Sequence, residues 1–285
     1  MSLLEVKHVY KSYQGFRLED ISFELPKGFV MGYIGENGAG KTTTLNLITH
    51  LCNLERGEIR IDGICYEDDP KKYLESIGFV GDEAYFPKDM TLKEIQKILK
   101  SMYSSFRETE FEKLVYDWQL PYNKKIGDYS KGMKVKLMFA TVFCRDTKLL
   151  ILDEATNGLD LVMRSDVIKM LQEYIMDGEH SILFSTHQLQ DLEPIADYIT
   201  FLHNGKVVCS QIKEELLESY VRIQGEESDL LESQRLLLVG MVSYAYGFEA
   251  IIRSKDIDQF GVEFTIEKAS IDQIMLHIIK NGGKI

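Results

Sequence analysis

Residues 29–43 read FVMGYIGENGAGKTT, an apolar run that leads into a glycine-rich loop ending in Lys41, Thr42 and Thr43. The loop at 35–43 matches the phosphate-loop pattern G-x-x-x-x-G-K-[ST] in full. The apolar run at 29–34 favours a buried strand, and residues 44–48 favour a helix. The loop therefore lies between a strand end and a helix N-terminus, which is where phosphate binding requires it.

The residues of this loop have distinct predicted tasks in holding a triphosphate. Its glycines let the backbone curl so that N–H groups point inward at an anion, and the following helix adds its positive dipole end. Lys41 is expected to reach the terminal phosphates, and the Thr42 hydroxyl to ligate Mg²⁺. The predicted nucleotide-binding residues are Gly35, Asn37, Gly38, Ala39, Gly40, Lys41, Thr42 and Thr43. Alone, the loop predicts a bound nucleoside triphosphate without indicating its purpose.

The composition argues against several other classes of protein. The chain has 285 residues and a net charge of −12, which disfavours nucleic acid as a partner because such a surface needs a basic patch. The four cysteines are far apart and form no metal-ligand spacing, so they indicate reduced thiols. We see no signal peptide, and the longest apolar stretch, 236–246, is well short of a membrane span. We therefore expect this chain by itself to be soluble.

Two periodicities predict an α/β fold. Apolar and polar residues alternate at 4–9, 21–25 and 57–63, which favours a small antiparallel sheet beside the nucleotide core. Strands alternate with helical patterns through the rest of the core, which predicts a mainly parallel sheet with helices on both faces. The predicted strands are 77–81, 149–152 and 181–185, and the predicted helices are 110–118, 130–144 and 160–176.

Three further segments complete the predicted organisation. Thr91 followed by Glu94 fits a capping box, and helical periodicity then continues, which predicts a helical subdomain at about 83–145. Asn204 and Gly205 predict a hairpin turn. Beyond about residue 213 we expect a small α+β appendage that carries no motif of known chemistry. Its predicted strands are 220–223, 241–247, 250–253 and 262–266, and its predicted helices are 228–238 and 271–280.

Two acids follow the apolar strand at 149–152. In phosphate-loop enzymes an acid at this strand end holds Mg²⁺, and Asp153 suits that role. Glu154 is the predicted general base that polarises the attacking water. Many core strands end in polar residues, but the combination with the loop at 35–43 favours the catalytic interpretation.

A second anion site is predicted at 128–133, where DYSKGM opens a helix. Ser130 suits an N-cap, and a small hydroxyl, a glycine and a helix N-terminus together favour an anion. This segment resembles the signature motif of ATP-binding cassette (ABC) proteins, whose usual form is LSGGQ. Ser130 and Gly132 are retained, and the resemblance implies that these two residues bind phosphate. Tyr129, Lys131 and Met133 replace Leu, Gly and Gln.

The other motifs of that family follow in order. Residues 157–160, NGLD, resemble the D-loop after the catalytic acid, and His187 ends the next strand as the switch histidine of the family does. The resemblance implies that His187 contacts the terminal phosphate and holds Glu154 and the water in line. Tyr13 stands where the family places an aromatic residue that stacks on adenine, with Phe16 as a close competitor.

One position departs from the family pattern. A glutamine usually follows the strand equivalent to 77–81, and Asp82 occupies that position here. An aspartate can also offer oxygen to Mg²⁺, so Asp82 is a candidate for catalysis and for the metal. Its negative charge near the terminal phosphate could slow turnover. Glu83 is the alternative equivalent of the glutamine.

The resemblance covers about residues 3–213 and implies a function. It indicates an ABC ATPase domain at 1–213 and an accessory α+β domain at 214–285. It implies the ATP-binding subunit of an ABC transporter, an ATPase that uses ATP and Mg²⁺. Such subunits work as head-to-tail pairs, with the loop of one facing 130–133 of the other. The implied partners are transmembrane permease subunits on separate chains and a second ATP-binding subunit, identical or related. The implied location is cytoplasmic, peripheral on the inner face of the cell membrane.

Two alternatives belong to other functional classes. A soluble, non-transport ABC ATPase would act in translation, DNA repair or cluster assembly. Translation members carry two cassettes and repair members carry a long coiled coil, whereas this chain has one cassette and no such insertion. A phosphate-loop kinase or GTPase would not need residues 130–133, and the guanine motif N-K-x-D is missing from the sequence.

Overall fold

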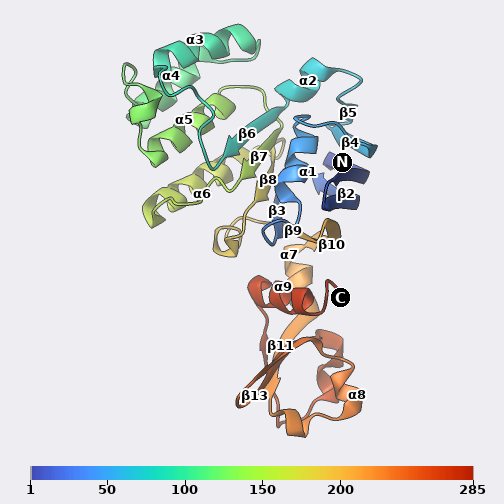
Figure 1. Ribbon diagram of the computed structural model, residues 1–285. Coiled ribbons are helices and arrows are strands. Elements are labelled where there is room, and N and C mark those ends of the chain that lie inside the picture. Colours follow the sequence, from blue (N-terminus) through green and yellow to red (C-terminus); the bar gives the residue numbers. More distant parts are fainter. Residues whose placement is uncertain (1, 285) are drawn as a thin grey trace.

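The computed structural model describes residues 2–284, which form an α/β core with a smaller unit at the C-terminal end (Figure 1). A six-stranded sheet in the order β10-β9-β3-β8-β7-β6 forms the centre of the core. All its neighbouring pairs are parallel except β9 and β10, which form an antiparallel pair, so the predicted mainly parallel sheet is confirmed. The strands are β3 (Val30–Gly35), β6 (Ile77–Gly81), β7 (Leu149–Asp153), β8 (Ser181–Ser185), β9 (Tyr198–His203) and β10 (Lys206–Ile212).

The apolar composition of these strands explains their central position. All six residues of β3 and all five of β8 are buried, as expected for strands covered on both faces. The carboxyl ends of β3, β6, β7 and β8 lie at one edge because the strands are parallel. The phosphate loop, Asp82, Glu154 and His187 follow these ends and Asp153 is the last residue of β7, so the topology collects the predicted site at one sheet edge.

The predicted antiparallel sheet is also confirmed, in the order β2-β1-β4-β5. It contains β1 (Ser2–Tyr13), β2 (Phe16–Pro26), β4 (Arg56–Ile61) and β5 (Ile64–Cys65). Its apolar side chains share one hydrophobic cluster with Met31 and Tyr33 of β3 and with Leu45 of α1 (Lys41–Ile48). This packing holds the antiparallel sheet against the helix that follows the phosphate loop.

The helical region has a core of its own. It contains α3 (Leu92–Met102), α4 (Glu108–Asp117) and α5 (Lys131–Phe143), whose apolar faces meet around Phe111 and Leu137. The predicted capping box between Thr91 and Glu94 begins α3. Two more helices of the α/β core are α2 (Pro70–Glu75), which the sequence analysis did not predict, and α6 (Leu161–Ile175).

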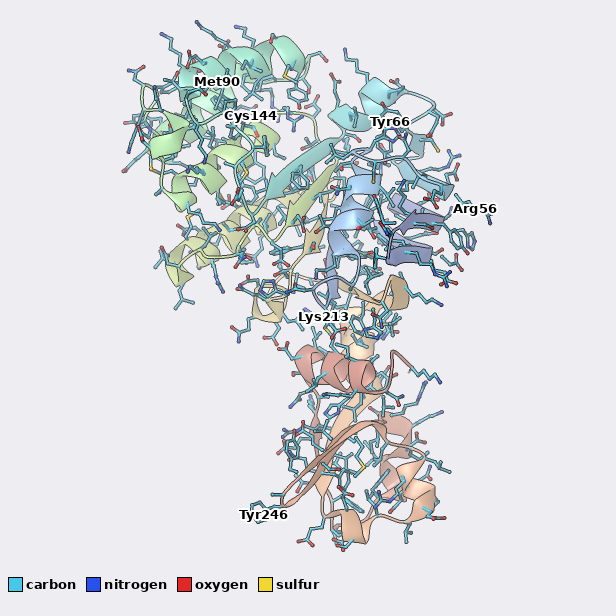
Figure 2. The ribbon with its side chains drawn as sticks, in the orientation of Figure 1. Arg56, Tyr66, Met90, Cys144, Lys213 and Tyr246 are labelled. Atoms are coloured by element: carbon cyan, nitrogen blue, oxygen red, sulfur yellow. The ribbon has the colours of Figure 1, made fainter. Side chains whose placement is uncertain are left out.

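The C-terminal unit follows α7 (Lys213–Ser219) and contains a sheet in the order β12-β13-β11-β14. Its strands are β11 (Tyr220–Gly225), β12 (Val239–Tyr244), β13 (Gly247–Arg253) and β14 (Thr265–Lys268). Helix α9 (Ile271–Lys280) shares a hydrophobic cluster with Val30 and Ile199 of the central sheet. Figure 2 shows Lys213 where the unit joins the core and Tyr246 at its far end.

The prediction of one helix over 228–238 is wrong in its extent. The structure has a 3₁₀ turn at Glu227–Asp229 and one short helix, α8 (Glu232–Arg235). The Gln234 side chain accepts from the Leu231 N–H and donates to the carbonyl of Gln259, which fixes this turn against a distant loop. The chain then enters β12, where Val239 pairs with Ile251. Tertiary pairing therefore overrides the local helical pattern.

Within residues 2–284, no helix has both the length and the apolar character needed to span a bilayer.

Candidate functional site

The phosphate loop is held open by glycine geometry. Gly40 has a φ of +110°, and a Cβ there would meet the side chains of Leu18 and Phe16, so this position requires glycine. Helix α1 begins at the next residue, Lys41. The Gly205 N–H donates to the carbonyl of Ala39 at 3.0 Å, so the predicted hairpin turn after β9 contacts the loop and helps to fix its backbone.

Lys41, which is predicted to contact the terminal phosphates, lies inside the phosphate loop. Its side chain is 7% exposed, and its ammonium donates to the Gly35 carbonyl at 2.7 Å and to the Glu36 carbonyl at 3.2 Å. Burial lowers the pKa of Lys41 below its ordinary value. These carbonyl contacts hold the ammonium inside the loop, where an anion with several oxygens would compete for it.

Thr42 and Asp153 form the candidate metal site. The Thr42 hydroxyl donates to Asp153 Oδ2 at 3.4 Å, across the gap between α1 and the end of β7. Among residues 2–284, neither Asp153 Oδ1 nor the Ser185 hydroxyl has a hydrogen-bond partner, although both atoms are buried. Burial raises the pKa of Asp153 in spite of the nearby hydroxyls. A buried carboxylate oxygen with unused lone pairs beside a hydroxyl fits Mg²⁺, which prefers such oxygen ligands.

Glu154 and His187, which are 33 positions apart in the chain, meet across neighbouring strands. His187 Nδ1 lies 2.7 Å from Glu154 Oε2. Glu154 has a φ of +53°, and its N–H donates to the carbonyl of Ser185 at 2.9 Å, which fixes the backbone in this uncommon conformation. Strain of this kind is often found at functional sites.

The structure confirms Ser130 as the N-cap of α5. Its hydroxyl accepts from the Met133 N–H at 3.3 Å, and the Ser130 side chain is exposed. Gly132, two residues later, is partly buried, and Lys131 between them points toward the end of β6. The Ser130 hydroxyl is therefore exposed at the helix N-terminus, where the first backbone N–H groups have no partner within the helix.

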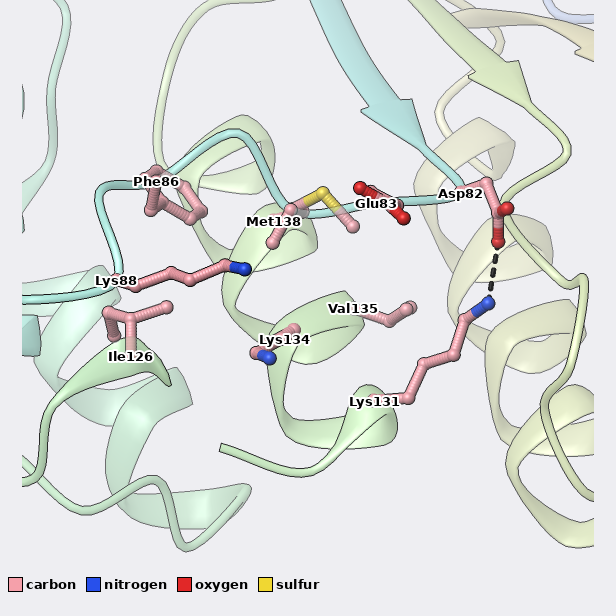
Figure 3. A pocket seen from close by; sticks show the side chains of 10 residues that line it. Asp82, Glu83, Phe86, Lys88, Ile126, Lys131, Lys134, Val135 and Met138 are labelled. Carbon is pink, nitrogen blue, oxygen red and sulfur yellow. Dashed lines mark hydrogen bonds and ion pairs between the residues drawn. The ribbon is translucent and has the colours of Figure 1, made fainter. Parts of the chain in front are cut away.

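Asp82 has a partner that the sequence analysis did not predict. Its Oδ1 lies 2.5 Å from the ammonium of Lys131 (Figure 3). In the register of the parallel sheet, Gly81 pairs with Asp153, so Asp82 begins its loop beside Glu154. Glu83 lines the same cavity as Asp82 without an equivalent ion pair in Figure 3. Of these two acids, Asp82 is the one that pairs, through Lys131, with the signature segment, residues 130–133.

The two candidate adenine-stacking residues, Tyr13 and Phe16, have different surroundings. Tyr13 ends β1 with half of its surface exposed, and the Lys11 ammonium lies 5.6 Å from its ring centroid. The ring of Phe16 lies directly beside Gly40. Tyr13 pairs with Phe16 in the antiparallel register of β1 and β2, so both residues stay candidates.

A buried network behind the D-loop also escaped the sequence analysis. The Thr156 hydroxyl donates to Asp191 Oδ2 at 2.6 Å, and Arg164 lies 3.8 Å from the other oxygen of that carboxylate. Arg164 also donates to the carbonyl of Leu159 at 3.2 Å. The network ties residues 157–160 to the segment after His187. The sequence offered no signal for this network, because no spacing or periodicity connects Thr156 or Arg164 with Asp191.

Replacing Asp153 by asparagine should stabilise the nucleotide-free chain. Because the folded-state pKa is raised above its ordinary 3.8, ionising this carboxyl costs more in the folded chain than in the unfolded one. The Asp153→Asn protein should therefore melt at a higher temperature than the unmodified chain. This difference is fully present above the pKa of Asp153 in the folded chain, and it disappears as the pH falls toward 3.8. Calorimetric melting of both proteins across this range checks the sign. A variant that melts lower at neutral pH would refute the electrostatic argument.

Comparisons with known proteins identify relatives of the whole core. A family described as ABC transporter matches residues 18–157. The ABC transporter ATP-binding protein YtrB of Bacillus subtilis is 31% identical over 223 residues, which cover 78% of this chain and 76% of YtrB. The bacitracin transport ATP-binding protein BcrA of Enterococcus faecalis is 30% identical over 72% of this chain and 68% of its own length. A solved ATP-binding subunit of an ABC transporter is 31% identical, with a TM-score of 0.69 over 75% of this chain and 92% of that one.

Proposed function

This chain belongs to the ABC transporter family and is an ATP-binding ATPase of that family, and we propose that it drives its transporter through ATP-dependent closure of two such subunits. The observation that carries the proposal is the 2.7 Å contact between Glu154 and His187 at the sheet edge that also holds the phosphate loop. An acid and a histidine in this arrangement are placed to orient water against a terminal phosphate.

We propose the following roles for the residues at this edge. Lys41 exchanges its two carbonyl contacts for phosphate oxygens, and the N-terminus of α1 adds further N–H donors. Glu154 accepts a proton from the attacking water, while His187 holds the carboxylate in line and meets the terminal phosphate. Mg²⁺ would be held by Thr42 and Asp153, with Asp82 as a further candidate, and when bound it neutralises developing charge on the phosphates.

A second subunit supplies the rest of the proposed site. Ser130 is exposed at the N-terminus of α5 and Gly132 follows two residues later, so they suit the ATP of another copy or of a related chain. Next to the D-loop, Leu161 and Val162 are 83% and 73% exposed, which leaves an apolar surface for a partner to cover. A head-to-tail pair would bury this surface and close two ATP molecules between the subunits.

We further propose that permease subunits on separate chains dock beside Asp82 and the helical region. Exposed apolar side chains occur on these segments: Tyr85 lies three residues after Asp82, Met102 ends α3 and Tyr116 lies on α4. The BcrA relative is named for bacitracin transport, and a Streptococcus pyogenes relative, SrtF, for lantibiotic transport. The chain would then lie at the inner face of the cell membrane. Residues 1–213 would form the ATPase domain, with 214–285 as an accessory domain.

Purification of the native protein from membranes tests the transporter assignment. The proposal predicts that a multi-span protein co-purifies with this chain after mild detergent extraction and that washing with salt alone does not separate them. Recovery of the native protein only in the soluble fraction, or in pellets only with ribosomes, would favour the non-transport ABC ATPase instead.

Replacing Asp82 by glutamine should raise the rate of ATP hydrolysis. The substitution removes a negative charge near the terminal phosphate, and we expect an increase of up to about tenfold, equivalent to about 1.4 kcal/mol of barrier. Steady-state phosphate release measures the effect, with Glu83→Gln as the matched control. An unchanged rate with Asp82→Gln, together with a changed rate with Glu83→Gln, would assign the role to Glu83.

A further inference from the structure

Lys131 connects the signature segment with the loop after β6. It is the first residue of α5, and its ammonium lies 2.5 Å from Asp82 Oδ1. Both residues line a cavity of about 280 Å³. Figure 3 marks an ion pair to Asp82 from Lys131 and none from Lys134, which lines the same cavity three residues further along α5. The helical region and the central sheet are therefore joined at this point by one pair of opposite charges.

The same ammonium also borders the D-loop. A Cβ placed on Gly158 would lie 3.2 Å from Lys131 Nζ, and Gly158 has a φ of +64°. Three segments therefore meet at one cation: the N-terminus of α5, the loop after β6 and the D-loop. A shift of the Lys131 ammonium changes the electrostatic environment of all three segments.

The pairing of Lys131 with Asp82 can be exchanged for a stronger one. Both side chains are 41% exposed, and ion pairs in contact with water contribute little to stability. A terminal phosphate carries more charge than a carboxylate and offers several oxygens to an ammonium. Lys131 lies between Ser130 and Gly132, the two residues that the proposed function assigns to the ATP of a second subunit.

We propose that Lys131 changes partners during the ATPase cycle, from Asp82 of its own chain to the terminal phosphate of ATP held by a second subunit. The inference rests on the proposed head-to-tail pair. Binding of ATP by one subunit would draw Lys131 of the other away from Asp82. Asp82 would then carry an unpaired negative charge beside the ATP of its own chain, so the exchange couples the two sites.

The exchange makes a distinctive prediction in the Glu154→Gln background, where hydrolysis does not deplete ATP. Adding Asp82→Asn removes the competing partner, so the ATP concentration for half-maximal dimerisation should fall by up to about fivefold, the shift that an exposed ion pair supports. Adding Lys131→Met should raise that concentration. With Lys131→Met present, Asp82→Asn should have no further effect. Sedimentation velocity at a series of ATP concentrations measures all four midpoints.

Two further variants control the experiment. Lys131→Arg keeps the cation and should restore the response to Asp82→Asn, whereas Lys134→Met should leave that response intact. An equal effect of Asp82→Asn with and without Lys131 would overturn the exchange, because Asp82 would then act only on its own ATP. No dimer at saturating ATP in the Glu154→Gln protein would instead overturn the proposed pairing of subunits. The two failures are therefore distinguishable.

Discussion

Replacing Glu154 by glutamine should reduce ATP hydrolysis by a factor of about 10² to 10⁴, the usual contribution of a general base, while ATP binding is retained. Glutamine has nearly the same shape and can still bond to His187, but it cannot accept the proton of the attacking water. The bridging phosphate would then persist, and we expect an ATP-bound dimer to accumulate. Single-turnover phosphate release and size-exclusion chromatography with ATP measure the two effects.

A matched control exists in the phosphate loop itself. Glu36 also pairs with a histidine, since its Oε2 lies 3.0 Å from His203 Nδ1, but it has no assigned role in the reaction. Glu36→Gln should therefore hydrolyse ATP within about twofold of the unmodified chain. A Glu154→Gln protein that turns over ATP at the normal rate would remove Glu154 from the role of base.

Replacing Lys41 by methionine should weaken ATP binding by about 100-fold. The loss corresponds to about 3 kcal/mol, in the upper range of what charged hydrogen bonds contribute. The nucleotide-free chain should not lose stability in proportion, because burial disfavours the charged form of Lys41 and methionine carries no charge to desolvate. Titration calorimetry with ATP and thermal melting without it separate the two quantities.

Lys134→Met is a suitable control for Lys41→Met, since it removes a cation from α5, outside the phosphate loop. We expect its ATP affinity to match that of the unmodified chain. Normal ATP affinity in the Lys41→Met protein would contradict the role of the loop lysine. A large fall in melting temperature would instead show that the carbonyl contacts of Lys41 support the folded loop.

Local features of the site could be predicted from the sequence because they depend on nearby residues. The phosphate loop, the N-cap at Ser130 and the turn at Gly205 each need particular residue types at fixed spacings. The meeting of Glu154 with His187 was implied by a resemblance to a family. Parallel pairing of β7 with β8 then brings their carboxyl ends together.

Contacts that depend on side-chain direction could not be predicted. The pair of Asp82 with Lys131 joins two subdomains, and Thr156 meets Asp191 behind the D-loop, although no periodicity connects either pair. The helix predicted at 228–238 was wrong in extent because Val239 enters a sheet whose partner strand follows later in the chain. In each case long-range packing determines the outcome.

A subunit-mixing measurement tests the composite site most directly. Ser130→Arg blocks the signature segment and Glu154→Gln removes the base, so each variant alone should be almost inactive. In a mixed head-to-tail dimer, the intact loop and base of the first variant face the intact signature segment of the second. An equal mixture, combined before ATP is added, should recover about a quarter of normal ATPase activity, since half of the dimers are mixed and each has one working site. Activity that stays at the level of the separate variants after mixing would contradict a site shared between two subunits.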